Sequence, residues 1–580
     1  MTLRSQHWFG GQTMDATSHR ASLKAEGFGE LAFDGRPVIG ICNTWSELVD
    51  CNSHFRELAE AVRRGVLMAG GLPLEFPVMS LGEILMSPTT MLYRNLMAMD
   101  VEECLRAYPL DGVVLLSGCD KTQPACLMGA ASADIPAIVV TGGPKLSGHW
   151  GEEELGSGTD AWRLRDELRA GRITVQDWDE IENSISRSCG HCMTMGTAST
   201  MACVTEALGM ALPGTAAIPA PDSRRRQAAE AAGRKIVELV ERDIRPSQVL
   251  TRSAFENAIR VLQAISGSTN AIIHLIALAG RVGLDLPLSL FDQLAEDTPW
   301  LVDLKPAGQH LMEDFYYAGG LPAVMAEIKH LLHVDALTVS GQAVGENIAR
   351  ARIQRSGAIA TASEPLSPGG GLVVLQGNLC PDGAVLKRSA ASEALLQHEG
   401  PALVFEDIYD LDVRIDSPDL DVTPDTVLVL RNTGPVGAPG MPEWGKLPIP
   451  KKLLAAGVHD MVRISDCRMS GTAYGAVILH VAPEAAVGGP LALVRTGDHI
   501  RLDVAQRRLD MLVSDAELAT RREAWRPRPP SDTRGYRSLF LEHVLQANEG
   551  CDFDFLRGKS PVMTSMRGPG GTSAVVQEAV

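Results

Sequence analysis

The chain has 580 residues, which is too long for one ordinary hydrophobic core, so we expect two or three domains. Its hydrophobic content of 45% and charged content of 21% are typical of a globular protein, and its apolar stretches fall well short of the ~20 residues that a membrane span needs. A net charge of −18 and an aromatic content of 5% argue against nucleic-acid binding. The amino terminus lacks the apolar segment of a signal peptide, which predicts a cytoplasmic location.

The first part of the chain alternates strand and helix patterns. Residues 37–42, 111–116 and 135–140 are short apolar runs typical of buried strands. Residues 55–69 carry apolar side chains at helical spacing, and the helix is expected to end at Gly70. This alternation predicts a parallel sheet covered by helices.

The middle of the chain is helical in pattern. Residues 146–185 are polar and charged, which predicts a helical excursion on the surface. Residues 197–209 and 254–283 are predicted helices whose small residues allow close packing. Residues 363–371 are rich in Ser, Pro and Gly and form a predicted linker.

Short segments rich in Val and Leu follow this linker, separated by Gly and Pro turns. They predict strands at 372–376, 402–405, 426–430, 461–464, 476–481 and 499–504. The predicted fold class is therefore α/β, with an N-terminal region (1–362) built on a parallel sheet flanked by helices and a C-terminal β-barrel-like domain (372–580).

Two different kinds of metal ligand stand side by side at the end of one predicted strand. Cys119, Asp120 and Lys121 follow the apolar run 112–118 directly. Parallel sheets bind their ligands at the carboxyl ends of such strands. A thiolate favours iron, zinc or copper, whereas a carboxylate favours magnesium, calcium or manganese. The pairing indicates two metals that serve one site.

The other cysteines leave several interpretations open. Cys51 and Cys192 lie in polar, glycine-rich segments, although a single cysteine is most often a small buried apolar residue. The motif Cys189-Gly-His-Cys192 has the spacing of a redox dithiol or of half a zinc site. It does not lie in a compact βαβ unit, and no second CxxC completes four zinc ligands.

Polar residues in later turns are further candidates. Glu83 and Glu443, like Asp120, follow turns with Gly or Pro that could direct a carboxylate inward, although a single carboxylate is usually solvated. Ser470 and Thr472 follow the predicted strand 461–464 and could also belong to an ordinary turn.

Taken in order, these motifs resemble the iron–sulfur dehydratases, the family of dihydroxy-acid, phosphogluconate and aldonate dehydratases. The resemblance runs from about residue 3 to about residue 556. The motifs that carry it are Cys51-Asn52 with His54, Gly118-Cys-Asp-Lys121, Cys192 with Met195-Gly-Thr-Ala-Ser-Thr200, Gly267-Ser-Thr-Asn270, Gly440-Met-Pro-Glu443 and Met469-Ser-Gly-Thr-Ala-Tyr-Gly475.

The resemblance implies two cofactors and a catalytic serine. It implies a [2Fe–2S] cluster with one open iron position, bound by Cys51, Cys119 and Cys192. It implies Mg²⁺ bound by Glu83, Asp120, Glu443 and a carbamylated Lys121. Ser470 is the implied base, with Lys121 and Thr472 as further catalytic residues. Three thiolates leave iron able to accept a hydroxyl, and a carbamate is a hard ligand that suits Mg²⁺.

Two stretches resemble the sugar-acid branch of the family, and within it the pentonate (arabinonate) dehydratases. They are Met193-Thr-Met-Gly-Thr-Ala198 and Arg468-Met-Ser-Gly-Thr-Ala473. The implied reaction dehydrates a small-molecule aldonate such as arabinonate or xylonate to the 2-keto-3-deoxy acid, and the implied assembly is a homodimer or homotetramer. Cys189 and Cys467 depart from the family pattern.

Three alternatives remain at this stage. A dihydroxy-acid dehydratase of branched-chain amino-acid biosynthesis shares the chemistry. A thiol–disulfide oxidoreductase would use Cys189 and Cys192. A non-catalytic iron–sulfur sensor would leave the carboxylates and Ser470 without a role.

Overall fold

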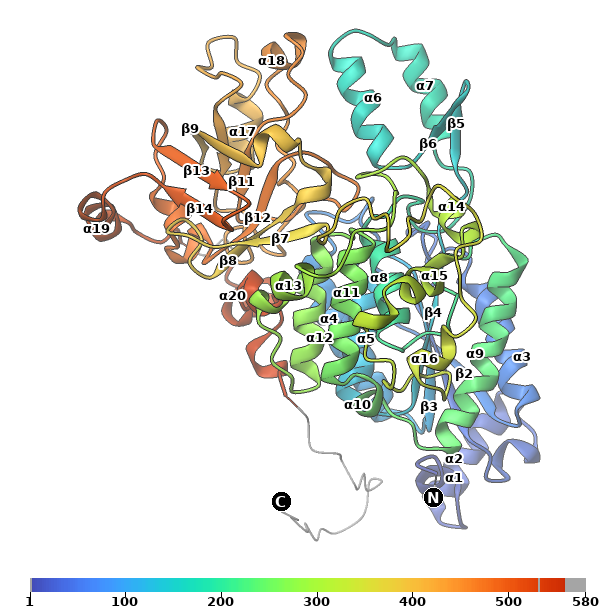
Figure 1. Ribbon diagram of the computed structural model, residues 1–580. Coiled ribbons are helices and arrows are strands. Elements are labelled where there is room, and N and C mark those ends of the chain that lie inside the picture. Colours follow the sequence, from blue (N-terminus) through green and yellow to red (C-terminus); the bar gives the residue numbers. More distant parts are fainter. Residues whose placement is uncertain (1–2, 530–531, 559–580) are drawn as a thin grey trace.

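A computed structural model describes residues 3–529 and 532–558. Figure 1 shows a larger part, coloured blue to yellow-green, in which helices surround a sheet, and a smaller β-rich part beside it in yellow to red. The predicted fold class, a helix-flanked parallel sheet with a C-terminal β-barrel-like domain, is confirmed. No helix among the described residues combines the length and apolar character that crossing a membrane requires.

The N-terminal sheet has four parallel strands in the order β2-β1-β3-β4. β1 (Val38–Asn43), β3 (Gly112–Ser117) and β4 (Ala137–Thr141) are buried along their whole length, as their unbroken apolar runs predict. The edge strand β2 (Leu72–Pro77) was not predicted, because it is half exposed and carries two prolines and a glutamate.

Helices cover both faces of this sheet. α3 (Phe55–Met68) and α9 (Ser223–Glu241) pack against each other, and so do α4 (Met91–Ala107) and α5 (Thr122–Ala133). α8 (Thr197–Ala207) is buried throughout, which confirms the helix expected there. Apart from α11 (Arg252–Ala264) and α12 (Asn270–Arg281), the excursion and the C-terminal segment, the described residues also form the helices α1 (Gln6–Phe9), α2 (Met14–Ala25), α10 (Pro246–Val249), α13 (Leu288–Ala295), α14 (Met312–Tyr317), α15 (Gly320–Glu327), α16 (Val344–Asn347), α17 (Ile408–Arg414), α18 (Lys451–Ala455) and α19 (Asp515–Ala524).

The prediction of a single helix over residues 254–283 is wrong. The structure has two helices there, α11 (Arg252–Ala264) and α12 (Asn270–Arg281). Ser266, with a φ of +46°, leaves the helical conformation between them. The apolar pattern hides this break, because both helices are buried and apolar residues continue on either side of it. The break places Asn270 at the start of α12.

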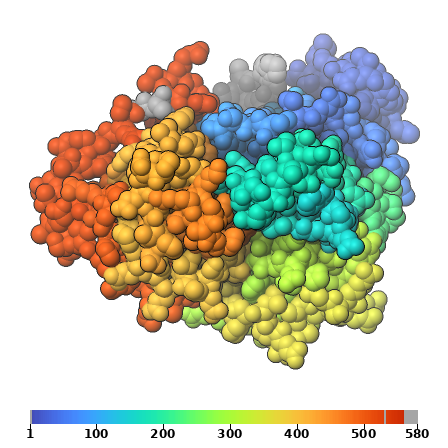
Figure 2. Space-filling view, turned by 90° about the horizontal axis from the view of Figure 1, so that it is seen from above, coloured from blue at the N-terminus to red at the C-terminus, as the bar shows by residue number. Residues whose placement is uncertain are grey.

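The polar excursion begins with a hairpin that was not predicted, β5 (Gly148–Trp150) and β6 (Glu153–Leu155). The expected helices follow as α6 (Thr159–Arg169) and α7 (Val175–Ser184). Figure 2 shows this segment, in cyan, on the surface and against the β-rich part. An ion pair of 2.9 Å between Arg169 and Asp416 joins the two.

The C-terminal sheet has eight strands in the order β14-β13-β9-β10-β11-β12-β8-β7. The six predicted strands correspond to β7 (Leu372–Leu375), β9 (Gln397–Phe405), β10 (Val427–Leu430), β11 (Arg463–Ser465), β12 (Val477–Ala482) and β13 (His499–Asp503). The strands β8 (Gly383–Lys387) and β14 (Arg508–Met511) were not predicted.

This sheet closes into a barrel just beyond β7. The Gln376 N–H donates to Arg507 O at 2.9 Å, and the Leu509 N–H donates to Gln376 O at 2.9 Å. Apolar side chains from the strands fill a core of their own. β9, β10, β11 and β12 run parallel, so the loops after β10 and β11 leave the same end of the barrel.

The last described segment returns to the N-terminal part. Phe540 on α20 (Gly535–His543) and Phe553 pack against Leu92 on α4. The division of the chain at residues 362 and 372 stays a prediction. Residues 559–580, the end of the predicted second domain, lie outside the described residues.

Candidate active site

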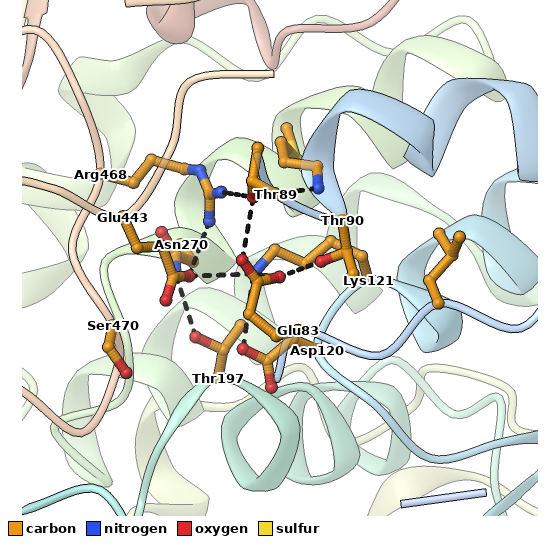
Figure 3. Close-up of polar contacts among 12 residues, drawn as sticks. Glu83, Thr89, Thr90, Asp120, Lys121, Thr197, Asn270, Glu443, Arg468 and Ser470 are labelled. Atoms are coloured by element: carbon orange, nitrogen blue, oxygen red, sulfur yellow. Dashed lines mark hydrogen bonds and ion pairs between the residues drawn. The ribbon is translucent and has the colours of Figure 1, made fainter. Parts of the chain in front are cut away.

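Three carboxylates from distant segments converge between the two parts of the molecule. Glu83 lies in the loop after β2, Asp120 between β3 and α5, and Glu443 in the loop after β10. One oxygen atom from each lies within 4.8 Å of the others (Figure 3). The three carboxylates predicted to bind magnesium are therefore brought together, and their carboxylate oxygens are the ligands that Mg²⁺ prefers.

The ammonium group of Lys121 lies among these carboxylates. Its Nζ is 2.9 Å from Glu443 Oε1, 3.2 Å from Glu83 Oε2 and 3.4 Å from Asp120 Oδ2. The side chain is fully buried. Burial lowers the pKa of Lys121, but the carboxylates of Glu443 and Glu83 outweigh burial and raise it overall. The unmodified lysine is thus a cation that partly balances the acidic group.

The nearby charges shift the pKa values of Glu83 and Asp120 in opposite directions. Burial raises the pKa of Glu83, but Lys121 and Arg468 outweigh burial and lower it to about 2. Burial, with the nearby Glu443 and Glu83, raises the pKa of Asp120 to about 6 although Lys121 opposes this. Carboxylates that crowd one another this closely favour a cation of higher charge, which is the property expected of a divalent metal site.

Hydrogen-bond donors hold the carboxylates in place. Glu83 accepts bonds from the hydroxyls of Thr89 (2.9 Å) and Thr90. Glu443 Oε1 accepts bonds from Arg468 Nη1 at 2.8 Å and from Asn270 Nδ2 at 2.9 Å. Arg468 is fully buried and also donates to the Thr89 hydroxyl at 3.0 Å, so one guanidinium connects the two glutamates (Figure 3).

The predicted base lies beside this group. Ser470 is half-buried in the loop after β11, and its Oγ lies 2.9 Å from Thr472 Oγ1. The Thr472 N–H also donates to Ser470 Oγ at 3.3 Å. Two donors therefore lie next to the serine oxygen, and they would stabilise it as an alkoxide. The Thr159 hydroxyl of α6 donates to Thr472 O at 2.8 Å and anchors this loop to the excursion.

The three cysteines predicted to bind the cluster lie in loops that adjoin the carboxylates. Cys51 follows β1 and Cys119 follows the neighbouring strand β3, and the two pack together in one buried cluster. The hydrogen bond with Cys119, followed by burial, raises the pKa of the Cys51 thiol. Burial, followed by the nearby Asp120, raises the pKa of Cys192 to about 11. These thiols hold their protons until a metal displaces them.

The surroundings of the thiols suit a bulky inorganic group. A Cβ atom at Gly118 would lie 3.0 Å from the Cys51 carbonyl oxygen, so only glycine fits beside the cysteine loop. Asn52 Oδ1, His191 Nε2 and Thr194 Oγ1 are buried and have no hydrogen-bond partner among the described residues. Thiols beside unpaired polar atoms fit a site that binds a further group.

The two cysteines that depart from the family pattern lie in different surroundings. Cys189 is half-buried among Glu57, Lys145 and Asp50, and burial raises the pKa of its thiol. Cys467 is fully buried and its Sγ accepts a hydrogen bond from the Ser465 hydroxyl at 3.1 Å. Burial raises the pKa of Cys467 to about 12, so this thiol is unreactive.

Four residues of the site had no role assigned from the sequence: Thr89, Thr90, Asn270 and Arg468. Asn270 and Arg468 occur in motifs that carry the family resemblance, which was the only signal for them. Their roles depend on contacts across the fold, since Asn270 and Glu443 are 173 residues apart.

Comparisons with known proteins identify the family of the chain. The family model for the N-terminal domain of dihydroxy-acid/6-phosphogluconate dehydratases matches residues 36–347, and the C-terminal model matches residues 357–551. An L-arabinonate dehydratase of Rhizobium leguminosarum bv. trifolii is 54% identical over 558 residues, which cover 96% of each chain.

Two further relatives extend the comparison. A 6-deoxy-6-sulfo-D-gluconate dehydratase of Pseudomonas putida is 53% identical over 97% of each chain. A dihydroxy-acid dehydratase of Acetivibrio thermocellus is 41% identical over 93% of this chain and 97% of its own. The chain therefore belongs to the dihydroxy-acid/6-phosphogluconate dehydratase family.

Proposed function

We propose that the protein is a hydro-lyase that dehydrates a sugar acid, an aldonate such as arabinonate or xylonate, to the 2-keto-3-deoxy acid. The observation that carries the proposal is the arrangement around the end of β3. There Cys119 packs against Cys51 and lies near Cys192, while Asp120 and Lys121 lie with Glu83 and Glu443, and this arrangement supports one reaction centre served by both groups.

The residues present fit both cofactors of the family. Mg²⁺ would be held by Glu83, Asp120 and Glu443, with Lys121 as its carbamate. A [2Fe–2S] cluster would be held by Cys51, Cys119 and Cys192. When bound, these groups supply Lewis acids for the substrate's carboxylate, its C2 hydroxyl and its departing C3 hydroxyl.

The chain's own residues supply the proton transfer. Ser470 takes the C2 proton, and the electrons of the C2–H bond form the C2=C3 double bond as the C3–O bond breaks. The departing hydroxide then takes this proton from the Ser470 hydroxyl and leaves as water, which returns Ser470 to its starting state. The resulting enol tautomerises to the 2-keto acid. The hydroxyl and N–H of Thr472 stabilise charge on the Ser470 oxygen as it forms.

Sequence identity favours a sugar acid over a branched-chain substrate. The arabinonate and sulfogluconate dehydratases are 54% and 53% identical to this chain, against 41% for the dihydroxy-acid dehydratase. The thiol–disulfide alternative is disfavoured because burial raises the pKa of both Cys189 and Cys192, whereas a redox dithiol needs a thiol of lowered pKa.

The test is anaerobic purification, an absorption spectrum, iron and sulfide analysis, and a substrate panel assayed for 2-keto acid. We expect turnover of L-arabinonate or D-xylonate at least tenfold faster than 2,3-dihydroxyisovalerate. A preference for dihydroxyisovalerate would replace this proposal with the branched-chain alternative. A cluster-bearing protein that turns over no hydroxy acid would indicate a sensor, and a colourless protein that reduces insulin disulfides would indicate an oxidoreductase.

The homodimer or homotetramer and the cytoplasmic location stay predictions. Light scattering of the purified holoenzyme tests the first, and cell fractionation tests the second.

A further inference from the structure

Asn270 connects the two parts of the molecule inside the site. It is the first residue of α12 and is fully buried. Its Nδ2 lies 2.9 Å from Glu443 Oε1 and 3.2 Å from the Met469 carbonyl oxygen, both in the barrel part. It also lies 3.0 Å from Thr197 Oγ1 of α8 (Figure 3).

The chemistry of these partners fixes which way the amide points. A carboxylate and a backbone carbonyl only accept hydrogen bonds, so Asn270 must present its NH₂ group to them. Its Oδ1 then faces away and is buried without a hydrogen-bond partner among the described residues. An unpaired buried carbonyl destabilises a fold. The side chain of Asn270 therefore makes the hydrogen bonds of its NH₂ group although its unpaired Oδ1 lowers the stability of the protein.

The two barrel contacts lie on paired segments. Trp444 and Met469 form an antiparallel bridge, which places Glu443 opposite Ser470. One NH₂ group thus holds the side chain of Glu443 on one segment and the backbone next to Ser470 on the other.

We infer that Asn270 is a positioning residue that sets Glu443 and Ser470 against the groups of the N-terminal part. The inference rests on the proposed function. Glu83, Asp120 and Lys121 belong to the N-terminal part, so the geometry of the site depends on how the barrel is aligned with them. A misplacement of about 1 Å at a reacting group can cost ~100-fold in rate.

The test compares Asn270→Ala with a matched control, Asn257→Ala. Asn257 is also fully buried, but it lies in α11, and its side chain bonds, among the described residues, to the backbone of His333, at 3.1 Å through Nδ2 and 2.7 Å through Oδ1. For each variant we would measure the melting temperature, the visible spectrum, kcat and KM for L-arabinonate, and the Kd for Mn²⁺ by electron paramagnetic resonance of metal-depleted protein.

For Asn270→Ala we expect a melting temperature and spectrum close to those of the wild type. We expect kcat to fall ~100-fold with KM changed less than threefold, and Mn²⁺ to bind at least ~10-fold more weakly. Asn257→Ala should lower the melting temperature and leave kcat per folded enzyme and Mn²⁺ affinity unchanged. If Asn270→Ala does not fold, Asn270→Ser, which is too short to reach both segments, carries the same expectations.

Values of kcat and Mn²⁺ affinity within twofold of the wild type would overturn the inference. It would also be overturned if the loss of activity only matched a loss of folded, cluster-bearing protein. A wild type that turns over no aldonate would refute the proposed function alone, because the Mn²⁺ measurement would still decide the role of Asn270.

Discussion

The buried ammonium of Lys121 lies 2.9 Å from the carboxylate of Glu443, which reaches it from the other part of the molecule. A cation thus already occupies the centre of the acidic group. A divalent metal entering there would meet the repulsion of this ammonium. Conversion of Lys121 to a carbamate would remove the positive charge and add an anionic oxygen ligand.

Metal binding should therefore depend on carbon dioxide. We expect metal-depleted protein to bind Mg²⁺ at least ~10-fold more tightly in bicarbonate buffer than in buffer freed of carbon dioxide, as measured by calorimetry. Lys121→Met should bind Mg²⁺ weakly and equally in both buffers. Equal affinities of the wild-type protein in the two buffers would contradict the carbamate.

Removal of the Ser470 hydroxyl should abolish the proton transfer and spare the cofactors. For Ser470→Ala we expect kcat to fall ~100- to 10,000-fold, with the visible spectrum unchanged, because the loss is that of a general base. Thr472→Val removes one of two donors to the serine oxygen and should cost less. Full turnover by a folded Ser470→Ala variant would exclude this residue as the base.

The two cysteines of the CxxC motif should differ in their effect on the cluster. Cys192→Ser should lose the visible absorption and most of the bound iron, because the serine hydroxyl is a poor replacement for a thiolate ligand. Cys189→Ser should retain both, since its thiol lies among Glu57, Lys145 and Asp50. Iron analysis of the two variants, purified side by side without oxygen, decides between them, and the opposite result would exchange their roles.

A buried lysine in the barrel should make stability depend on pH. Lys387 on β8 is 1% exposed, its Nζ has no hydrogen-bond partner among the described residues, and burial lowers its pKa to about 7. Between this value and the ~10.4 of an unfolded lysine, the unfolded chain holds a proton that the folded protein lacks. The contribution of Lys387 to stability therefore rises with pH across this window.

Lys387→Met should remove this dependence. We expect its free energy of unfolding in urea to exceed that of the wild type by ~1–3 kcal/mol at pH 7, and the difference to shrink toward pH 10. Lys451→Met, at an exposed lysine, is the control and should leave the curve unchanged. A constant difference from pH 7 to pH 10 would show that Lys387 does not titrate in this range.

The excursion should influence catalysis through one glycine. Gly158 has a φ of +83°, and a Cβ atom there would lie 2.4 Å from Thr472 Oγ1. Gly158→Ala should therefore displace the loop of Ser470 and lower kcat ~10- to 100-fold. Gly151→Ala is the matched control, because Gly151 also has a positive φ (+58°) but no atom of the described residues, its two chain neighbours aside, lies within 4 Å of its Cβ position. Similar kcat values for the two variants would show that only backbone strain matters.

The sequence predicts those elements whose burial leaves a simple pattern. The unbroken Val and Leu run of β3 is recognisable because both of its faces are buried. The edge strand β2 has one exposed side and no such run. The break between α11 and α12 is hidden for the opposite reason, because everything around it is buried.

Site residues that are adjacent in the chain could be predicted from the sequence, whereas residues that meet only in the folded protein could not. Cys119, Asp120 and Lys121 are consecutive, so their chemistry could be predicted as a unit. The bond between Arg468 and Thr89 joins residues 379 positions apart. No periodicity or local motif encodes such a contact, which depends on how the barrel packs on the N-terminal part.

The described segment after α20 limits how the barrel moves relative to the N-terminal part. The buried Arg94 donates to the carbonyl oxygens of Gly550 and Cys551 at 2.9 Å, and so fastens the segment after α20 to α4. The barrel is thereby tethered at both of its ends, and it cannot swivel on the linker as on a single hinge. Ligand traffic must then rely on smaller displacements of loops rather than on separation of the two halves.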